Sequence, residues 1–245
     1  MADDRKINKK FLIVGTGRNG SSLLSAILAN SGANFDMKPL EEWDRRSGAL
    51  EHHYIHESYK WFSRAKKIRS SVIPQIFGYK FCIGKSNSYI QKLFDKADFA
   101  KSSKLIWMVK RIADHLDYQV RIIGVYRNFS DYLVSRYRKF GGSYNKWRSY
   151  WENVNYTLLL QSRIYKSVLI GYEEMVDFAQ KEWAENLAFL TGLSKAKILE
   201  QRKKIVNQKL AQREPRSLFE NPDTRKLYET LRNNKDFNFI DEKKT

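Results

Sequence analysis

The chain has 245 residues, of which 42% are hydrophobic and 14% aromatic, a composition typical of a folded globular protein and not of a disordered chain. Its single cysteine, Cys82, excludes an intramolecular disulfide and a thiolate-based zinc site. The formal net charge of +18 indicates a field that attracts nucleotides, phosphorylated or sulfated molecules, nucleic acid or an acidic membrane face. No apolar run is long enough to span a bilayer, and no linker-like segment interrupts the chain, so we expect one domain over residues 1–245 and a cytoplasmic location.

Apolar runs and glycine stops predict strands that alternate with helices. Strands are expected over residues 10–16, 75–82, 120–126 and 167–172. Helices are expected over residues 21–31, 54–69, 104–117, 129–139 and 144–166, and in a C-terminal part with a break at 191–193. Strands that are apolar throughout favour a parallel sheet covered on both faces. We therefore predict an α/β, P-loop-like, three-layer fold with a central parallel sheet flanked by helices.

Polar residues follow three of the predicted strands, at 15–22, 127–135 and 172–174. The carboxyl ends of parallel strands lie at one edge of a sheet, where ligands of such folds bind. We expect these three segments to form one site.

The first of them, "GTGRNGSS", has the G-x-x-x-x-G spacing of a phosphate-binding loop between Gly15 and Gly20. Its backbone N–H groups, the positive end of the following helix and the hydroxyls of Ser21 and Ser22 can bind an anion. Ser21 stands where a nucleoside-triphosphate P-loop has lysine, so Arg18 would supply the cation. No apolar strand ends in a Walker-type Asp, and we expect no metal.

This loop resembles the first signature of the nucleotide-dependent sulfotransferases, which use 3′-phosphoadenosine 5′-phosphosulfate (PAPS) as sulfuryl donor. Their loop has the form PKSGTT or GxxRSGTT and binds the 5′-phosphosulfate. In "VGTGRNGSSLL", Arg18 takes the cation position, Asn19 replaces the usual serine, and two serines replace the threonines. The resemblance implies donor contacts from Gly15, Thr16, Gly17, Arg18, Asn19, Gly20, Ser21 and Ser22.

The segment "GVYRNFSDYLVSRY" (124–137) is similar to the second signature of the family. Arg127 and Ser135 fall on the positions that hold the 3′-phosphate, and Phe129 replaces the usual proline. A guanidinium at a strand end can form a bidentate contact with a phosphate. A third segment, "LIGYEEMV" (169–176), resembles the family's xxYEDL, where Tyr172 could stack on the adenine or simply pack. "AFLTGLS" (188–194) extends the resemblance over most of the chain.

The resemblance implies in-line transfer of a sulfuryl group to a hydroxyl or amine. Arg18 and Lys80, which matches a lysine after the family's second strand, would stabilise developing charge. The segment "SGALEHHYIHESY" (47–59) is similar to a bacterial pattern that places a glutamate near the acceptor, so Glu51 is the expected general base. The rival bases are Glu41, His52, His53 and His56.

Two other functions fit parts of the sequence. A P-loop kinase with a displaced lysine would explain the glycine loop, but no evident carboxylate would hold its magnesium. A non-enzymatic nucleic-acid-binding protein would explain the charge, which concentrates at residues 60–69 and 201–209, but no nucleic-acid-binding module is recognisable. We expect a small-molecule or glycan acceptor, with anionic acceptors included, no nucleic acid and no membrane span, as in the soluble, bacterial-like branch of the family.

Overall fold

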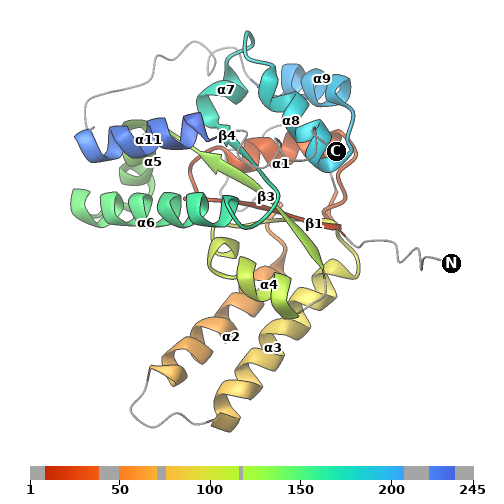
Figure 1. The fold of residues 1–245 in the computed structure, drawn as a ribbon, viewed down its shortest axis with the longest axis vertical. Helices are drawn as coiled ribbons and strands as arrows, with labels where there is room; N and C mark the ends of the chain where they lie inside the picture. The colour runs from red at the N-terminus through yellow and green to blue at the C-terminus, as the bar shows by residue number, and fades with distance from the viewer. Residues whose placement is uncertain (1–8, 39–49, 71–75, 116–117, 207–220, 235–245) are drawn as a thin grey trace, which may run out of the picture.

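The computed structural model describes residues 9–38, 50–70, 76–115, 118–206 and 221–234. Four parallel strands form one sheet in the order β2-β1-β3-β4 (Figure 1). The strands are β1 (Lys9–Gly15), β2 (Phe99–Lys101), β3 (Gln119–Tyr126) and β4 (Ser167–Gly171). Helices cover both faces of the sheet, so the predicted α/β fold with a flanked parallel sheet is confirmed.

Alternating side chains of each strand enter two separate hydrophobic cores, as the two-residue period of a strand requires. On β1, Leu12 and Val14 lie in one core, and Phe11 and Ile13 lie in the other. The first core includes side chains from α2 (His53–Arg69), α3 (Ile76–Phe94), α4 (Val109–His115), α5 (Phe129–Phe140), α6 (Tyr144–Ser162) and α11 (Pro222–Asn233). The second includes side chains from α1 (Ser21–Asn30), α7 (Tyr172–Val176), α8 (Glu182–Thr191) and α9 (Lys195–Ile205).

The predicted strand over residues 75–82 is wrong, because residues 76–82 open helix α3 and residue 75 lies outside the described residues. Cys82, Ser86, Ile90 and Leu93 are all buried, at the spacing of one helical face. That face meets α2, where the hydroxyls of Ser58 and Ser86 lie 2.9 Å apart. A short apolar run such as this one is compatible with a strand or a helix. Packing against α2 stabilises the helix.

The strand that does follow α3 is β2, which has only three residues and was not predicted. It pairs with β1 in the register Phe11 to Phe99 and Ile13 to Lys101. The predicted helix over 104–117 is a 3-10 turn, η1 (Leu105–Trp107), followed by α4, with residues 116–117 outside the described part. Helix α6 ends at Ser162 rather than at 166.

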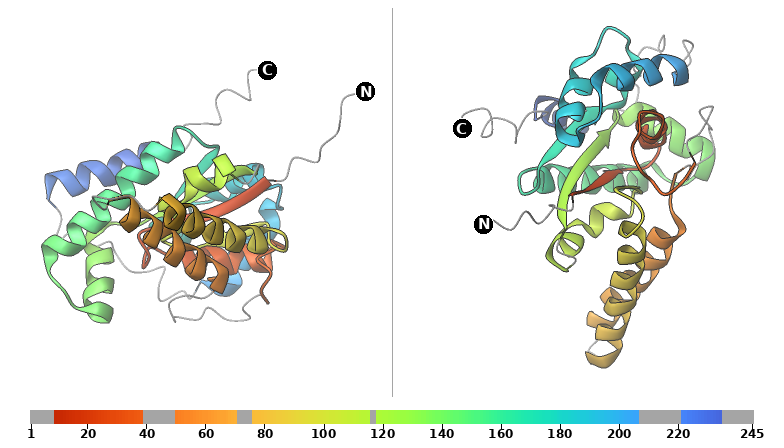
Figure 2. Two further views of the ribbon diagram at one scale, coloured as in Figure 1. Left: turned by 90° about the horizontal axis from the view of Figure 1, so that it is seen from below. Right: turned by 90° about the vertical axis from the view of Figure 1, so that its right-hand side faces the viewer.

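Helices α2 and α3 lie side by side and extend away from the sheet (Figures 1 and 2). Near the sheet, α2 begins beside the carboxyl end of β2, because Glu51, just before the helix, lies 3.6 Å from the Lys101 Nζ. Within the described residues, no helix combines the length and apolar character that crossing a membrane requires.

Candidate active site

The loop between β1 and α1 has an unusual backbone, with positive φ angles at Gly17 (66°), Arg18 (61°) and Gly20 (94°). Gly20 is the N-cap residue of α1, and because it has no side chain, it makes no capping hydrogen bond of that kind. The first N–H groups of a helix have no partner inside it. The loop and the start of α1 together therefore offer the backbone donors that an anion site needs.

Asn19 fixes this loop to the sheet. Its side chain is fully buried, its Nδ2 donates a hydrogen bond to the Val125 carbonyl of β3, and its Oδ1 accepts from the Ser21 N–H at 3.3 Å. The polar atoms of the Asn19 side chain are thus used inside the protein. Asn19 was predicted to contact the donor, and its backbone N–H is the group that stays available for that contact.

The structure brings Arg18, Arg127 and Ser135 together from three different elements. The Arg18 Nε donates to the Ser135 Oγ at 3.0 Å, and the Arg127 Nη1 lies 3.5 Å from the Arg18 carbonyl oxygen. Arg127 directly follows β3, and Ser135 lies in α5, whose first turn is capped by Asn128, which accepts from the Asp131 N–H at 3.2 Å. Two of the three polar segments expected at one sheet edge therefore meet.

Tyr172, the first residue after β4, brings the third segment to the same place. Its ring centre lies 4.1 Å from the Arg127 guanidinium carbon, a distance at which a cation is attracted to the face of a ring. The ring also covers Gly20, since a Cβ built there would lie 2.5 Å from the Tyr172 Cδ2. Tyr172 thus packs between Arg127 and the loop.

Arg136 belongs to this site although it was not predicted. Its Nη2 donates to the Thr16 carbonyl of the loop. Four aromatic rings surround its guanidinium carbon at 5.0 to 5.4 Å, those of Tyr132, Phe140, Trp147 and Tyr150. Two features of the sequence could have pointed to Arg136. It lies next to Ser135 within the second signature, and aromatic residues stand four places before and after it.

Lys101 is the second functional candidate that sequence reasoning missed. It ends β2, is 2% exposed, and its Nζ donates to the Ser22 Oγ at 3.1 Å. Burial lowers the pKa of Lys101, and Glu51, 3.6 Å away, opposes that shift. Lys80, which was expected at a strand end, lies instead on helix α3 with an exposed side chain, whereas Lys101 does stand at a strand end.

Among the expected bases, Glu51 is connected to the start of α1 through Lys101. Its carboxylate lies 3.6 Å from the Lys101 Nζ, and that same Nζ contacts Ser22. The side chain is also exposed enough to meet an acceptor. Glu41 lies outside the described residues.

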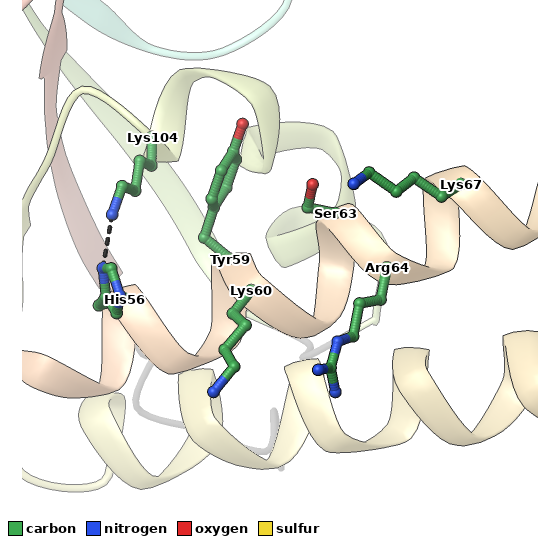
Figure 3. A pocket seen from close by; sticks show the side chains of 7 residues that line it. All are labelled: His56, Tyr59, Lys60, Ser63, Arg64, Lys67 and Lys104. Carbon is green, nitrogen blue, oxygen red and sulfur yellow. Dashed lines mark hydrogen bonds between the residues drawn. The ribbon is translucent and has the colours of Figure 1, made fainter.

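The three histidines have other contacts. His52 caps α2, because its Nδ1 accepts from the Tyr54 N–H at 3.3 Å, and burial lowers the pKa of His52. The His53 ring stacks on that of His52. The His56 Nδ1 lies 2.6 Å from the Lys104 Nζ (Figure 3). His52 and His53 thus lie at the start of α2, and their contacts there give them a structural role. Among the described residues, His, Cys, Asp and Glu side chains form no group of three that could hold a metal ion.

Positively charged side chains predominate around the loop. Burial lowers the pKa of Arg18, and repulsion from Arg127 and Arg136 lowers it further. The Nε atoms of Arg127 and Arg136 are buried without a hydrogen-bond acceptor in the part of the chain that the structure describes. Converging guanidinium groups with spare donors are the arrangement that a phosphate or sulfate would stabilise.

A partly buried carboxylate, that of Glu173, supports this cluster. Glu173 accepts hydrogen bonds from the Asn128 N–H and from the Tyr228 hydroxyl, each at 3.1 Å. Burial raises the pKa of Glu173, and these hydrogen bonds and Arg127 oppose the shift. Helix α11, which carries Tyr228, is thereby tied to the start of α5. The contact holds the backbone beside Arg127 in place.

Comparison with known proteins agrees with this geometry. A family model described as a sulfotransferase domain matches residues 8–193. A search of curated proteins finds no match. Among solved structures, the chain is similar to the sulfotransferase domain from the Synechococcus PCC 7002 olefin synthase, with a TM-score of 0.54 and 18% identity over 95% of this chain and 98% of that one. At that identity the likeness concerns the fold.

Proposed function

Because the chain belongs to the sulfotransferase domain family, we propose that it transfers a sulfuryl group from PAPS to a hydroxyl or amine group of an acceptor. The observation that carries the proposal is the convergence of Arg18, Arg127 and Ser135 on a glycine loop at the start of α1. We propose further that the acceptor is a small molecule or a glycan. The cytoplasmic location, the single domain and the independence from metal stay predictions.

The residues present fit such a donor. PAPS carries negative charge at both its 5′-phosphosulfate and its 3′-phosphate. Two cationic groups, Arg18 and Lys101, flank the loop and the start of α1, and Arg127 and Ser135 lie together at the end of β3 and on α5. Arg127 has a buried Nε without an acceptor among the described residues. Burial and, after it, repulsion from Arg127 and Arg136 lower the pKa of Arg18, and anions bound to these groups would relieve the repulsion.

The donor supplies an activated sulfuryl group on its 5′-phosphate, and the chain must stabilise the charge that grows on the leaving phosphate oxygen. Lys101 is held for this task by Ser22 and Glu51. Arg18, which is always charged, stabilises the same charge electrostatically and donates no proton. The positive end of α1 adds its dipole at the same place.

Glu51 takes the proton of the acceptor. In the balanced step, the acceptor oxygen forms a bond to sulfur, the bond from sulfur to the leaving phosphate oxygen breaks, and the hydroxyl proton moves to the Glu51 carboxylate. The products are the sulfated acceptor and 3′,5′-diphosphoadenosine. The pair of Glu51 with Lys101 at 3.6 Å keeps base and electrophilic cation at one place.

Transfer of a radiolabelled sulfuryl group from PAPS to a panel of phenols, sugars and amines tests this function. Wild-type protein should label at least one acceptor class, and Lys101→Met should be slower by about 100-fold or more, the usual effect of losing one donor to developing charge. Nucleotide binding, measured in parallel, shows whether the variant keeps its site. Equal rates would remove Lys101 from the mechanism, and no transfer to any acceptor would argue against the enzymatic function.

A further inference from the structure

A pocket of about 400 Å³ lies along α2, lined by side chains of that helix and by Lys104 (Figure 3). Its lining is strongly cationic, and among the described residues no acidic side chain contributes to it. The cationic groups are Lys60, Arg64, Lys67 and Lys104. A concave surface of one charge sign concentrates ions of the opposite sign.

Within the part of the chain that the structure describes, few acidic groups offset this charge. Among the ion pairs of the described residues, the one that involves the lining joins Lys60 to Glu57 at 3.7 Å, and both side chains are solvent-exposed at 51% and 33%. An exposed pair of this kind is weak. Arg64 and Lys67 lie on the same helix with exposed side chains, and the Arg64 guanidinium carbon lies 4.9 Å from the centre of the Trp61 ring. The pocket therefore keeps a positive field for a bound molecule.

The remaining lining residues offer polar and aromatic contacts. Tyr59 and Ser63 present hydroxyl groups, and the Lys104 Nζ lies 5.7 Å from the centre of the Tyr59 ring. The contact with the His56 Nδ1 at 2.6 Å holds Lys104 against α2. Hydroxyl donors beside fixed cations are suited to sulfate, phosphate or carboxylate oxygens.

The position of the pocket connects it to the proposed chemistry. Its helix, α2, begins two residues after Glu51, and Lys104 follows Lys101 by three residues. The lining residues of α2, from His56 to Lys67, recur every three or four residues on one side of the helix. At the rise of an α-helix they extend over roughly 16 Å away from Glu51.

We propose that this pocket binds an anionic group of the acceptor. The acceptor is then a hydroxyl-bearing molecule that carries sulfate, phosphate or carboxylate, with its anion on α2 and its reacting hydroxyl at Glu51. The sulfation of that hydroxyl rests on the proposed function, whereas the binding of the anionic group to the pocket does not.

Four probes with one sugar ring separate the possibilities: glucose, glucose 6-phosphate, glucose 6-sulfate and glucuronate. Their affinities for the full-length protein are measured by NMR titration at low and moderate salt. The test variant combines Lys60→Gln, Arg64→Gln and Lys67→Gln. The control combines Lys197→Gln, Lys203→Gln and Lys204→Gln, which removes the same charge from exposed positions of α9 on the other side of the sheet.

At least one anionic probe should bind the wild type more tightly than glucose does, and the test variant should bind it about tenfold more weakly, as expected for the loss of several exposed contacts. The control should keep the wild-type affinity. The preferred probe then identifies the anionic group. Equal binding of glucose, equal losses in both triple variants, or no binding of any anionic probe would overturn the inference.

A parallel titration with 3′,5′-diphosphoadenosine separates this inference from the proposed function. Pocket-dependent binding of anionic sugars without any nucleotide binding would leave the anion site standing and remove the sulfotransferase function. Nucleotide binding without binding of the anionic sugars would remove the anion site and leave the sulfotransferase function standing.

Discussion

Replacing Gly20 by alanine tests the geometry of the loop most sharply. Gly20 has φ 94° and ψ 2°, a left-handed conformation, and it lies against Tyr172. A Cβ there would lie 2.5 Å from the Tyr172 Cδ2 and 3.0 Å from the Met175 Cε. Alanine therefore adds backbone strain and a steric clash at once.

The two contributions can be separated by a matched control. Gly192 has nearly the same backbone, φ 76° and ψ 5°, and a Cβ there would meet nothing within 4 Å. Gly192→Ala should thus show the backbone strain alone, about 1–2 kcal/mol. Gly20→Ala should lose about 1–3 kcal/mol more, the usual cost of overpacking a well-packed site. Changes in the unfolded chain are the same for both and cancel.

Urea unfolding of both variants and the wild type measures these differences as shifts of the midpoint at unchanged slope. Below the transition, titration with 3′,5′-diphosphoadenosine should show weakened binding for Gly20→Ala and wild-type binding for Gly192→Ala. If Gly20→Ala is no less stable than Gly192→Ala and binds the nucleotide normally, the contact between the loop and Tyr172 is not as described.

Three further predictions concern individual side chains. Arg127→Ala should weaken binding of 3′,5′-diphosphoadenosine by about 2–5 kcal/mol, the range for a truncated charge pair, and should spare AMP in calorimetry, because AMP has no 3′-phosphate. Glu51→Gln should leave nucleotide binding intact and slow single-turnover transfer by about 10²–10⁴-fold; an unchanged rate would place the base elsewhere. Burial lowers the pKa of His52, so the folded state binds its proton less tightly than the unfolded state does, and the wild type should lose stability as the pH falls below about 6.5. His52→Asn keeps an N-cap acceptor and should reduce that loss in urea unfolding; identical pH profiles would show that His52 does not titrate in this way.

The sequence was sufficient for the elements whose signals are local. β1, β3 and β4 are apolar runs that end at polar or glycine residues, and the loop after β1 carries its own glycine pattern. Because the ends of parallel strands meet, the proximity of Arg18, Arg127 and Tyr172 also followed from the topology.

The failures in the fold depend on contacts between distant segments. β2 has three residues, and its identity as a strand rests on pairing with Phe11–Ile13, far away in sequence. Lys101 was therefore not expected at a strand end, and Lys80 was expected at one instead. The first residues of α3 are an apolar run whose helical state depends on packing against α2. Arg136 was within reach, since it lies inside the second signature.

The central claim is that a glycine loop without the P-loop lysine binds a 3′-phosphorylated adenine nucleotide. Calorimetric titration of the protein with 3′,5′-diphosphoadenosine, ADP and AMP, without added metal, tests it most directly. We predict that the first binds at least about 30-fold more tightly than the other two, the lower end of what a truncated charge pair costs. Equal affinity for all three, or no binding of any, would contradict the account.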